Sequence, residues 1–119
     1  MKTISLTFCF VFLAAIGFAQ KLKNGTYTYT LAFEEWGRKS LNTTCTVIIK
    51  GDSIKILNNG SGHLTGAKGD VIDSGIIIKH KTGKYIIAEN KKDKNAAEIG
   101  GCTGGPRVIS FTRKTYYKC

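Results

Sequence analysis

The stretch CTVIIKGDSIKIL, residues 45–57, decides the fold class of this chain. Two β-branched runs, residues 44–50 and 53–57, lie on either side of Gly51 and Asp52. A two-residue connection of this kind is typical of a tight hairpin, because glycine accepts the positive φ angle that such turns require. The stretch therefore predicts two antiparallel strands joined by a short turn.

Strand-like patterns extend to both sides of this hairpin. In residues 25–34, GTYTYTLAFE, aromatic and apolar residues alternate with smaller ones, mostly threonine, which is typical of a half-buried strand. The string GIIIKHKTGKYIIAEN predicts a second hairpin, with strands over residues 76–80 and 84–89. A last hairpin is expected from RVISF and TYYKC, residues 107–111 and 115–119.

These elements predict an all-β fold. About seven short strands, with a turn signal roughly every ten residues, favour a small antiparallel barrel or sandwich built from hairpins. At most one short helical turn is expected, over residues 93–98, because this polar segment is too short for a stable free helix.

The N-terminus has the pattern of a secretory signal peptide. A basic residue precedes a mostly apolar stretch, residues 4–16, and small residues end at Ala19. We expect cleavage between Ala19 and Gln20, which makes residues 1–19 the signal peptide and residues 20–119 a single β domain. The apolar stretch is shorter than the roughly 20 residues of a membrane span, so the chain is expected to be secreted or periplasmic.

The chain is strongly basic, with 18 Lys and Arg against 8 Asp and Glu and a formal net charge of +10. Lysine dominates, since the arginines are Arg38, Arg107 and Arg113 alone. A lysine-rich field attracts anions diffusely, whereas specific recognition of phosphate or guanine favours arginine. The charge therefore disfavours a nucleic-acid site, and it leaves open an anionic or apolar extracytoplasmic ligand or a protein partner.

Three cysteines, Cys45, Cys102 and Cys119, follow the predicted signal peptide, in a context where disulfides persist. Cys102 precedes the last hairpin and Cys119 ends it, which favours a Cys102–Cys119 bridge worth about 3 kcal/mol in the chain-entropy model. Cys45 shares its strand parity with Val47 and Ile49 and is then a buried thiol. A bridge from Cys45 to either of the other two remains an alternative.

The strand count and the cysteine usage resemble those of small lipocalin-like or lysozyme-inhibitor-like exported β-barrels. No motif of either family is matched. The resemblance therefore implies a fold class and assigns no residue role.

Two glycine-rich loops, residues 58–70 and residues 100–106, invite a catalytic or phosphate-binding interpretation. Neither has the lysine of a P-loop or the third glycine of GxGxxG in place, and no long helix follows. A nucleophilic Cys102 would need His63 or His80 as a base, and nothing in the sequence orients either one. The sequence thus predicts no catalytic residue, no cofactor and no metal site, since closely spaced ligand pairs are missing.

Two further expectations concern these segments. His80 lies beside a hairpin turn among lysines and is expected to be solvated, and the loop of residues 58–70 is expected to be the most flexible segment of the chain. A small secreted hydrolase that uses Cys102 with His63 stays the enzymatic alternative.

Residues 34–38, together with the two glycine-rich loops, are expected to form the rim of a ligand site. Aromatic side chains near both ends of the domain would meet if the terminal strands pair, and they would form either a core or an apolar pocket. The sequence therefore predicts a non-enzymatic binding protein, with a basic polyanion-binding protein as another alternative. The candidate ligand-binding residues are Trp36, Glu35, Arg38, His63 and Tyr29.

Overall fold

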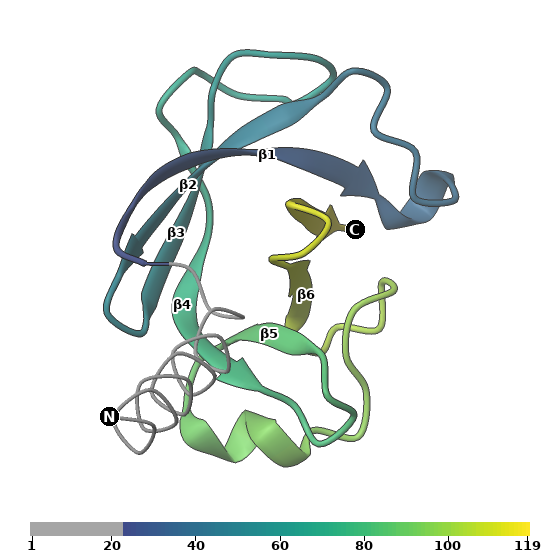
Figure 1. The fold of residues 1–119 in the computed structure, drawn as a ribbon. Coiled ribbons are helices and arrows are strands. Elements are labelled where there is room, and N and C mark those ends of the chain that lie inside the picture. Colours follow the sequence, from purple (N-terminus) through teal and green to yellow (C-terminus); the bar gives the residue numbers. More distant parts are fainter. Residues whose placement is uncertain (1–22) are drawn as a thin grey trace, which may run out of the picture.

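A computed structural model describes residues 23–119, so the predicted signal peptide lies outside the described residues. The chain forms a closed barrel in which each strand pairs with the next in sequence and the last pairs with the first (Figure 1). The predicted all-β class and the barrel are confirmed. The elements are β1 (Gly25–Phe33), η1 (Glu34–Trp36), β2 (Thr44–Lys50), β3 (Ser53–Asn58), β4 (Val71–Lys79), β5 (Tyr85–Ala88), η2 (Lys91–Asn95), β6 (Arg107–Ser110) and β7 (Thr115–Lys118).

The hairpin predicted around Gly51 is the β2–β3 pair. Lys50 pairs with Ser53 and the register continues without a break to the pairing of Cys45 with Asn58. Gly51 has a φ angle of 61°, in the left-handed region that favours glycine. The glycine in this turn therefore permits the tight reversal from which the register follows.

The barrel closes through a parallel pairing of β1 with β7. Leu31 pairs with Tyr116, and the backbone N–H of Thr30 donates to the carbonyl of Lys114 at 2.9 Å. In Figure 1 the C-terminal strands lie beside the end of β1. Closure leaves no unpaired sheet edge among these strands, and it brings the aromatic ends of the domain together.

Side chains that alternate along the strands fill the barrel interior. In β1, for example, Tyr29, Leu31 and Phe33 are buried and face inward, while Thr28 and Thr30 are exposed. The inward-facing side chains of all seven strands form one cluster inside the barrel. Its fully buried members include Val47, Ile54, Ile56, Ile87 and Ile109.

A second buried layer lies outside the barrel wall over β5. Ile86 and Ala88 alternate with the inward-facing Ile87, yet both are buried and neither belongs to the inner cluster. The 3-10 turn η2 contacts β4 and β5 on this side of the wall. The segment after β5 therefore folds back over the sheet as a cover.

His80 fastens this cover, and its expected solvation is wrong. The side chain is 3% exposed, with Nε2 at 2.8 Å from the carbonyl of Ala96 and Nδ1 at 2.9 Å from the hydroxyl of Thr82. Because a carbonyl only accepts, Nε2 carries the proton. The backbone N–H of Lys81 also donates to Lys94, so the covering segment is tied to the β4–β5 turn at two points.

The expected helical turn lies slightly earlier than predicted and is not alone. It begins at Lys91 because the side chain of Asn90 caps it by accepting the N–H of Lys92 at 2.9 Å. A further 3-10 turn, η1, ends β1 and is closed by Gly37 at a φ angle of 67°.

Candidate functional site

A pocket of about 570 Å³ opens at one end of the β6–β7 hairpin. One wall comes from the region of η1, and the other comes from the β4–β5 turn and the loop before β6 (Figure 1). Its lining comprises Glu34, Arg38, residues 83–85, residues 99–101, residues 108–113 and Tyr117.

Apolar side chains form the floor of the pocket. Phe111 is 6% exposed and its ring meets Tyr85 edge-on, with 5.1 Å between the ring centroids. On its other side Phe111 approaches the core residue Tyr29, with centroids 6.5 Å apart. The floor is thus an outward continuation of the barrel core, and burial against the core fixes its aromatic rings in place.

Three cationic side chains line the pocket, and they differ in their partners. Arg38 lies 3.4 Å from the carboxylate of Glu34 and 5.7 Å above the ring centroid of Tyr117. Lys84 and Arg113 make no ion pair within residues 23–119. The positive charge left uncompensated therefore belongs to Lys84 and Arg113.

A disulfide joins the loop before β6 to the C-terminus, as predicted. Cys102 and Cys119 are bonded, with 4.9 Å between their Cα atoms. We call residues 96–106 the stapled loop, because this bond and the hydrogen bond from the N–H of Gly100 to the carbonyl of Pro106 hold it. Cys102 has no thiol in this state, so it is not the nucleophile that the enzymatic alternative requires.

The loop between β3 and β4, which is expected to be the most flexible segment, is fastened by more side-chain hydrogen bonds than the stapled loop. We call residues 59–70 the pinned loop. The hydroxyl of Ser61 accepts the N–H of Thr44 at 2.9 Å, and the N–H of His63 donates to the hydroxyl of Thr43 at 3.0 Å. The side chain of Asn59 donates to the Thr44 hydroxyl at 2.7 Å. The loop closes the barrel end over β2 and does not line the pocket.

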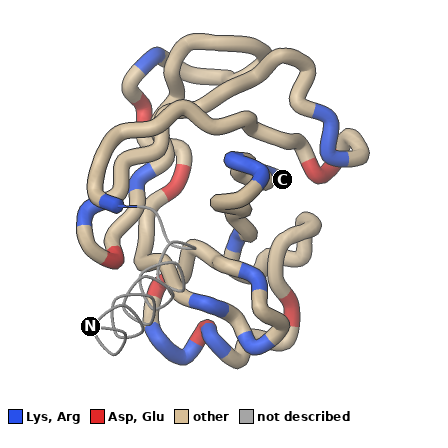
Figure 2. Tube along the Cα trace, viewed as in Figure 1, with Lys and Arg blue, Asp and Glu red and all other residues tan. Residues whose placement is uncertain are grey.

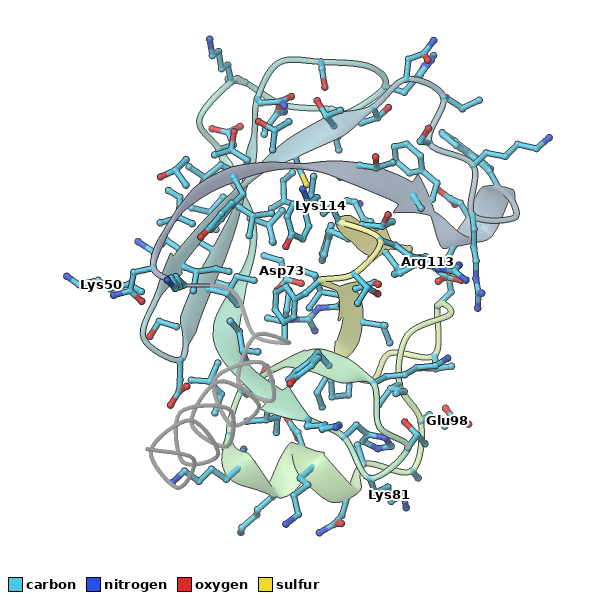
Figure 3. The ribbon with its side chains drawn as sticks, viewed as in Figure 1. Lys50, Asp73, Lys81, Glu98, Arg113 and Lys114 are labelled. Carbon is cyan, nitrogen blue, oxygen red and sulfur yellow. A yellow bond between two sulfur atoms is a disulfide. The ribbon has the colours of Figure 1, made fainter. Side chains whose placement is uncertain are left out.

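A polar network lies inside the barrel (Figure 3). Asp73 accepts two hydrogen bonds of 2.6 Å from the guanidinium of Arg107 and one of 2.8 Å from the hydroxyl of Tyr116. The hydrogen bond to Asp73 raises the pKa of Arg107, and burial raises the pKa of Tyr116. Because the carboxylate is fully engaged and these residues do not line the pocket, the network stabilises the interior and offers no free acid or base.

Two further titratable groups are buried near the pinned loop. Cys45 is inaccessible, as expected, and burial raises its pKa to about 12. Burial also raises the pKa of Tyr29 to about 12, and its hydroxyl has no hydrogen-bond partner among residues 23–119. Both groups are therefore neutral at ordinary pH, and the Cys45 thiol is a poor nucleophile.

The five candidate ligand-binding residues do not gather at one place. Arg38 lines the pocket. Tyr29 belongs to the core, at 1% exposure, and His63 is exposed on the pinned loop. Trp36 is 44% exposed and packs on Phe33, with 4.5 Å between the ring centroids, and Glu35 is exposed beside it; neither lines the pocket.

Residues 34, 38, 100 and 101 of the predicted rim line the pocket, but sequence reasoning missed Lys84, Tyr85 and Arg113. Tyr85 and Ile109 become neighbours through the β5–β6 register, which brings Lys84 next to the turn that carries Arg113. These residues lie far apart in the chain and share no motif. Their strand parity indicated which side chains face inward, but only the pairing of β5 with β6 reveals the cluster.

Comparisons with protein-family models, with curated proteins and with solved structures returned no match. No helix within residues 23–119 is long and apolar enough to span a membrane. In the same part of the chain, no group of three or more His, Cys, Asp or Glu side chains is arranged to hold a metal ion.

Proposed function

We propose that this protein is a non-enzymatic binding protein that takes a small molecule into the pocket beside η1. The observation that carries the proposal is a concave site of about 570 Å³ whose floor is aromatic and whose rim is cationic. Pockets of roughly 300–1,000 Å³ that combine an apolar lining with a few polar groups are typical of small-molecule sites. The stapled loop and the β6–β7 turn hold this lining in a preformed arrangement.

The chemistry of the pocket supports binding more than catalysis. The one carboxylate in the lining, Glu34, is engaged by Arg38, and Cys102 is bonded to Cys119. Cys45, the free cysteine of the described chain, is buried away from the pocket. A hydrolase that uses cysteine with histidine would need both side chains in the pocket, and the lining contains neither residue type.

The test uses 2-naphthamide, an uncharged flat molecule, as a calorimetric probe. We expect saturable binding at one site. Thr112→Trp should weaken it by about tenfold or more, because the new indole occupies part of the pocket. Thr28→Trp is the matched control, since Thr28 is exposed on β1 and does not line the pocket. Lack of saturable binding, or equal loss in both variants, would refute the proposal.

A second candidate function is the binding of extended polyanions by the lysine-rich surface. Lys81, Lys91, Lys92 and Lys94 are exposed and make no ion pair within the described chain, and the hydrogen bond between the backbones of Lys81 and Lys94 keeps them together (Figure 2). Binding of long-chain polyphosphate should then weaken steeply between low and physiological salt. Retention on a polyphosphate resin that does not change with salt would count against this candidate.

The cellular location belongs to the same proposal. We propose that the chain is exported and that the mature protein begins at Gln20; the disulfide between Cys102 and Cys119 is compatible with an oxidising compartment. Intact mass of protein recovered outside the cytoplasm should match residues 20–119 less two hydrogens. Recovery of the uncleaved chain would contradict this.

A further inference from the structure

We infer that the pocket is specific for an aromatic acid: a flat apolar ring system over Phe111 and Tyr85 whose anionic group lies between Lys84 and Arg113. The inference rests on the proposed function and goes beyond it, because it names the chemical class of the ligand and the residues that select it. Carboxylate and phosphate share the required chemistry.

The register of the sheet brings the two cations to one place. Tyr85 pairs with Ile109, so Lys84 lies beside Ser110, one residue past the end of the β5–β6 ladder. Ser110 is also where the β6–β7 turn begins, and its hydroxyl accepts the N–H of Arg113 at 3.1 Å. Lys84 and Arg113 therefore lie in neighbouring turns, β4–β5 and β6–β7, at the same end of the β5–β6 pair, and both line the pocket.

The charges around the pocket are asymmetric. On the η1 side, Arg38 is 3.4 Å from Glu34, so that wall is close to neutral. At the β6–β7 corner, Lys84 and Arg113 have no acidic partner in the part of the chain that the structure describes. An anion is therefore attracted to the corner with Lys84 and Arg113 and not to the η1 wall.

Hydroxyl groups and an aromatic surface complete the two halves of the proposed site. The hydroxyls of Ser110 and Thr112 lie 3.3 Å apart at the cationic corner, where they add donors for an oxyanion. Next to them, Tyr85 and Phe111, whose ring planes are inclined at 61°, provide an aromatic surface for a flat ligand. The anion-binding corner and the aromatic floor are therefore adjacent, as an aromatic acid requires.

The deciding experiment compares 2-naphthoate with 2-naphthamide, which differ in charge and hardly in shape. By calorimetry we expect the wild-type protein to bind 2-naphthoate about tenfold more tightly or better, since two charge-assisted contacts favour the anion. Lys84→Gln combined with Arg113→Gln should remove this preference, so that the variant binds 2-naphthoate and 2-naphthamide with about equal affinity. The charge-matched control is Lys50→Gln with Lys55→Gln, which should keep the preference, because neither lysine lines the pocket and Lys50 lies across the barrel from Arg113 (Figure 3).

Each outcome decides something different. If 2-naphthamide binds in the pocket but 2-naphthoate binds no better, the proposed function survives and this inference is overturned. The inference is also overturned if the Lys50 and Lys55 control loses as much preference as the Lys84 and Arg113 variant, because net charge then accounts for the preference. If neither probe binds, the proposed function itself fails. 1-Naphthyl phosphate as a third probe separates the two anions, and a preference for either one supports the inference.

Discussion

The two glycine-rich loops of this barrel have similar compositions and are held in place in different ways. The pinned loop (residues 59–70) and the stapled loop (residues 96–106) contain four glycines each. Side-chain hydrogen bonds to Thr43 and Thr44 fasten residues 59–63 of the pinned loop. The stapled loop depends on the disulfide at Cys102 and on a few bonds within itself.

The difference shows that a glycine-rich composition does not determine whether a loop closes over the barrel or stays open to line a pocket. Both loops use left-handed backbone angles. The pinned loop has polar partners on the strand below it and therefore becomes part of the barrel wall. The stapled loop has few such partners, so one of its edges stays open and lines the pocket.

The largest expected effect comes from adding a methyl group to one glycine of each loop. Gly62 and Gly104 have φ angles of 58° and 84°, so alanine costs about 1 kcal/mol of backbone strain at each. At Gly62 the new Cβ also collides with Thr43, whereas at Gly104 it meets no atom within 4 Å. We expect Gly62→Ala to lower the free energy of unfolding by about 4 kcal/mol in urea titrations, and Gly104→Ala by about 1 kcal/mol. Equal losses would show that the pinned loop is not packed against Thr43.

Removing the staple should be the next largest effect. Cys102→Ser with Cys119→Ser should lower the free energy of unfolding by about 3 kcal/mol, because the closed chain is lost in the unfolded state. Amide exchange of the stapled loop should accelerate in the same variant, while the pinned loop keeps its protection. Faster exchange in both loops would mean that the two ends of the barrel open together.

Alkaline pH should lower the free energy of unfolding, because two buried groups near the pinned loop, Cys45 and Tyr29, then favour the unfolded state. Burial raises the pKa of Cys45 from 9.0 to about 12 and that of Tyr29 from 10.0 to about 12, so both groups release protons more readily when unfolded. Their contribution is complete below pH 9 and is lost as the pH rises toward 12. At pH 10 we expect a loss of about 2 kcal/mol relative to pH 8. Cys45→Ala should flatten this dependence, and a flat wild-type profile would contradict the buried neutral thiol.

The smallest expected effect comes from removing one hydrogen-bonding hydroxyl at each loop and comparing the losses in the free energy of unfolding. Thr43→Val removes a buried hydroxyl and leaves the N–H of His63 without its acceptor, which should cost about 1.5 kcal/mol. Thr103→Val removes a hydroxyl that bonds Gly100 and Gly105 on the exposed stapled loop, where water replaces it, so the loss should stay below about 0.5 kcal/mol. Thermal unfolding of the two variants side by side measures the difference. A larger loss for Thr103→Val would reverse the comparison.

Local patterns predicted the barrel well. The alternation through Tyr29 and Leu31, the turn at Gly51 and the position of Cys102 before the last hairpin each depend on neighbours in sequence. These features are confirmed because backbone preference and burial act in the same direction there.

The parts that failed depend on contacts between distant segments. His80 is buried because residues 96 and 82 supply its partners, and the local lysines gave no sign of this. The place of Asp73 inside the barrel was not predicted, because the strand that contains it was expected to begin at residue 76, and its parity with the inward-facing Ile77 was therefore not considered. The pocket likewise depends on the strand register and not on a motif.

The central claim is that the open end beside the stapled loop binds ligand and that the closed end under the pinned loop does not. The most direct measurement is an amide NMR titration of the ¹⁵N-labelled protein with 2-naphthoate. We predict saturable shifts confined to residues 83–85, 99–101 and 108–113 together with the neighbourhood of Arg38, and no shifts in residues 59–70. Shifts centred on residues 59–70, or weak shifts scattered over the surface without saturation, would contradict it.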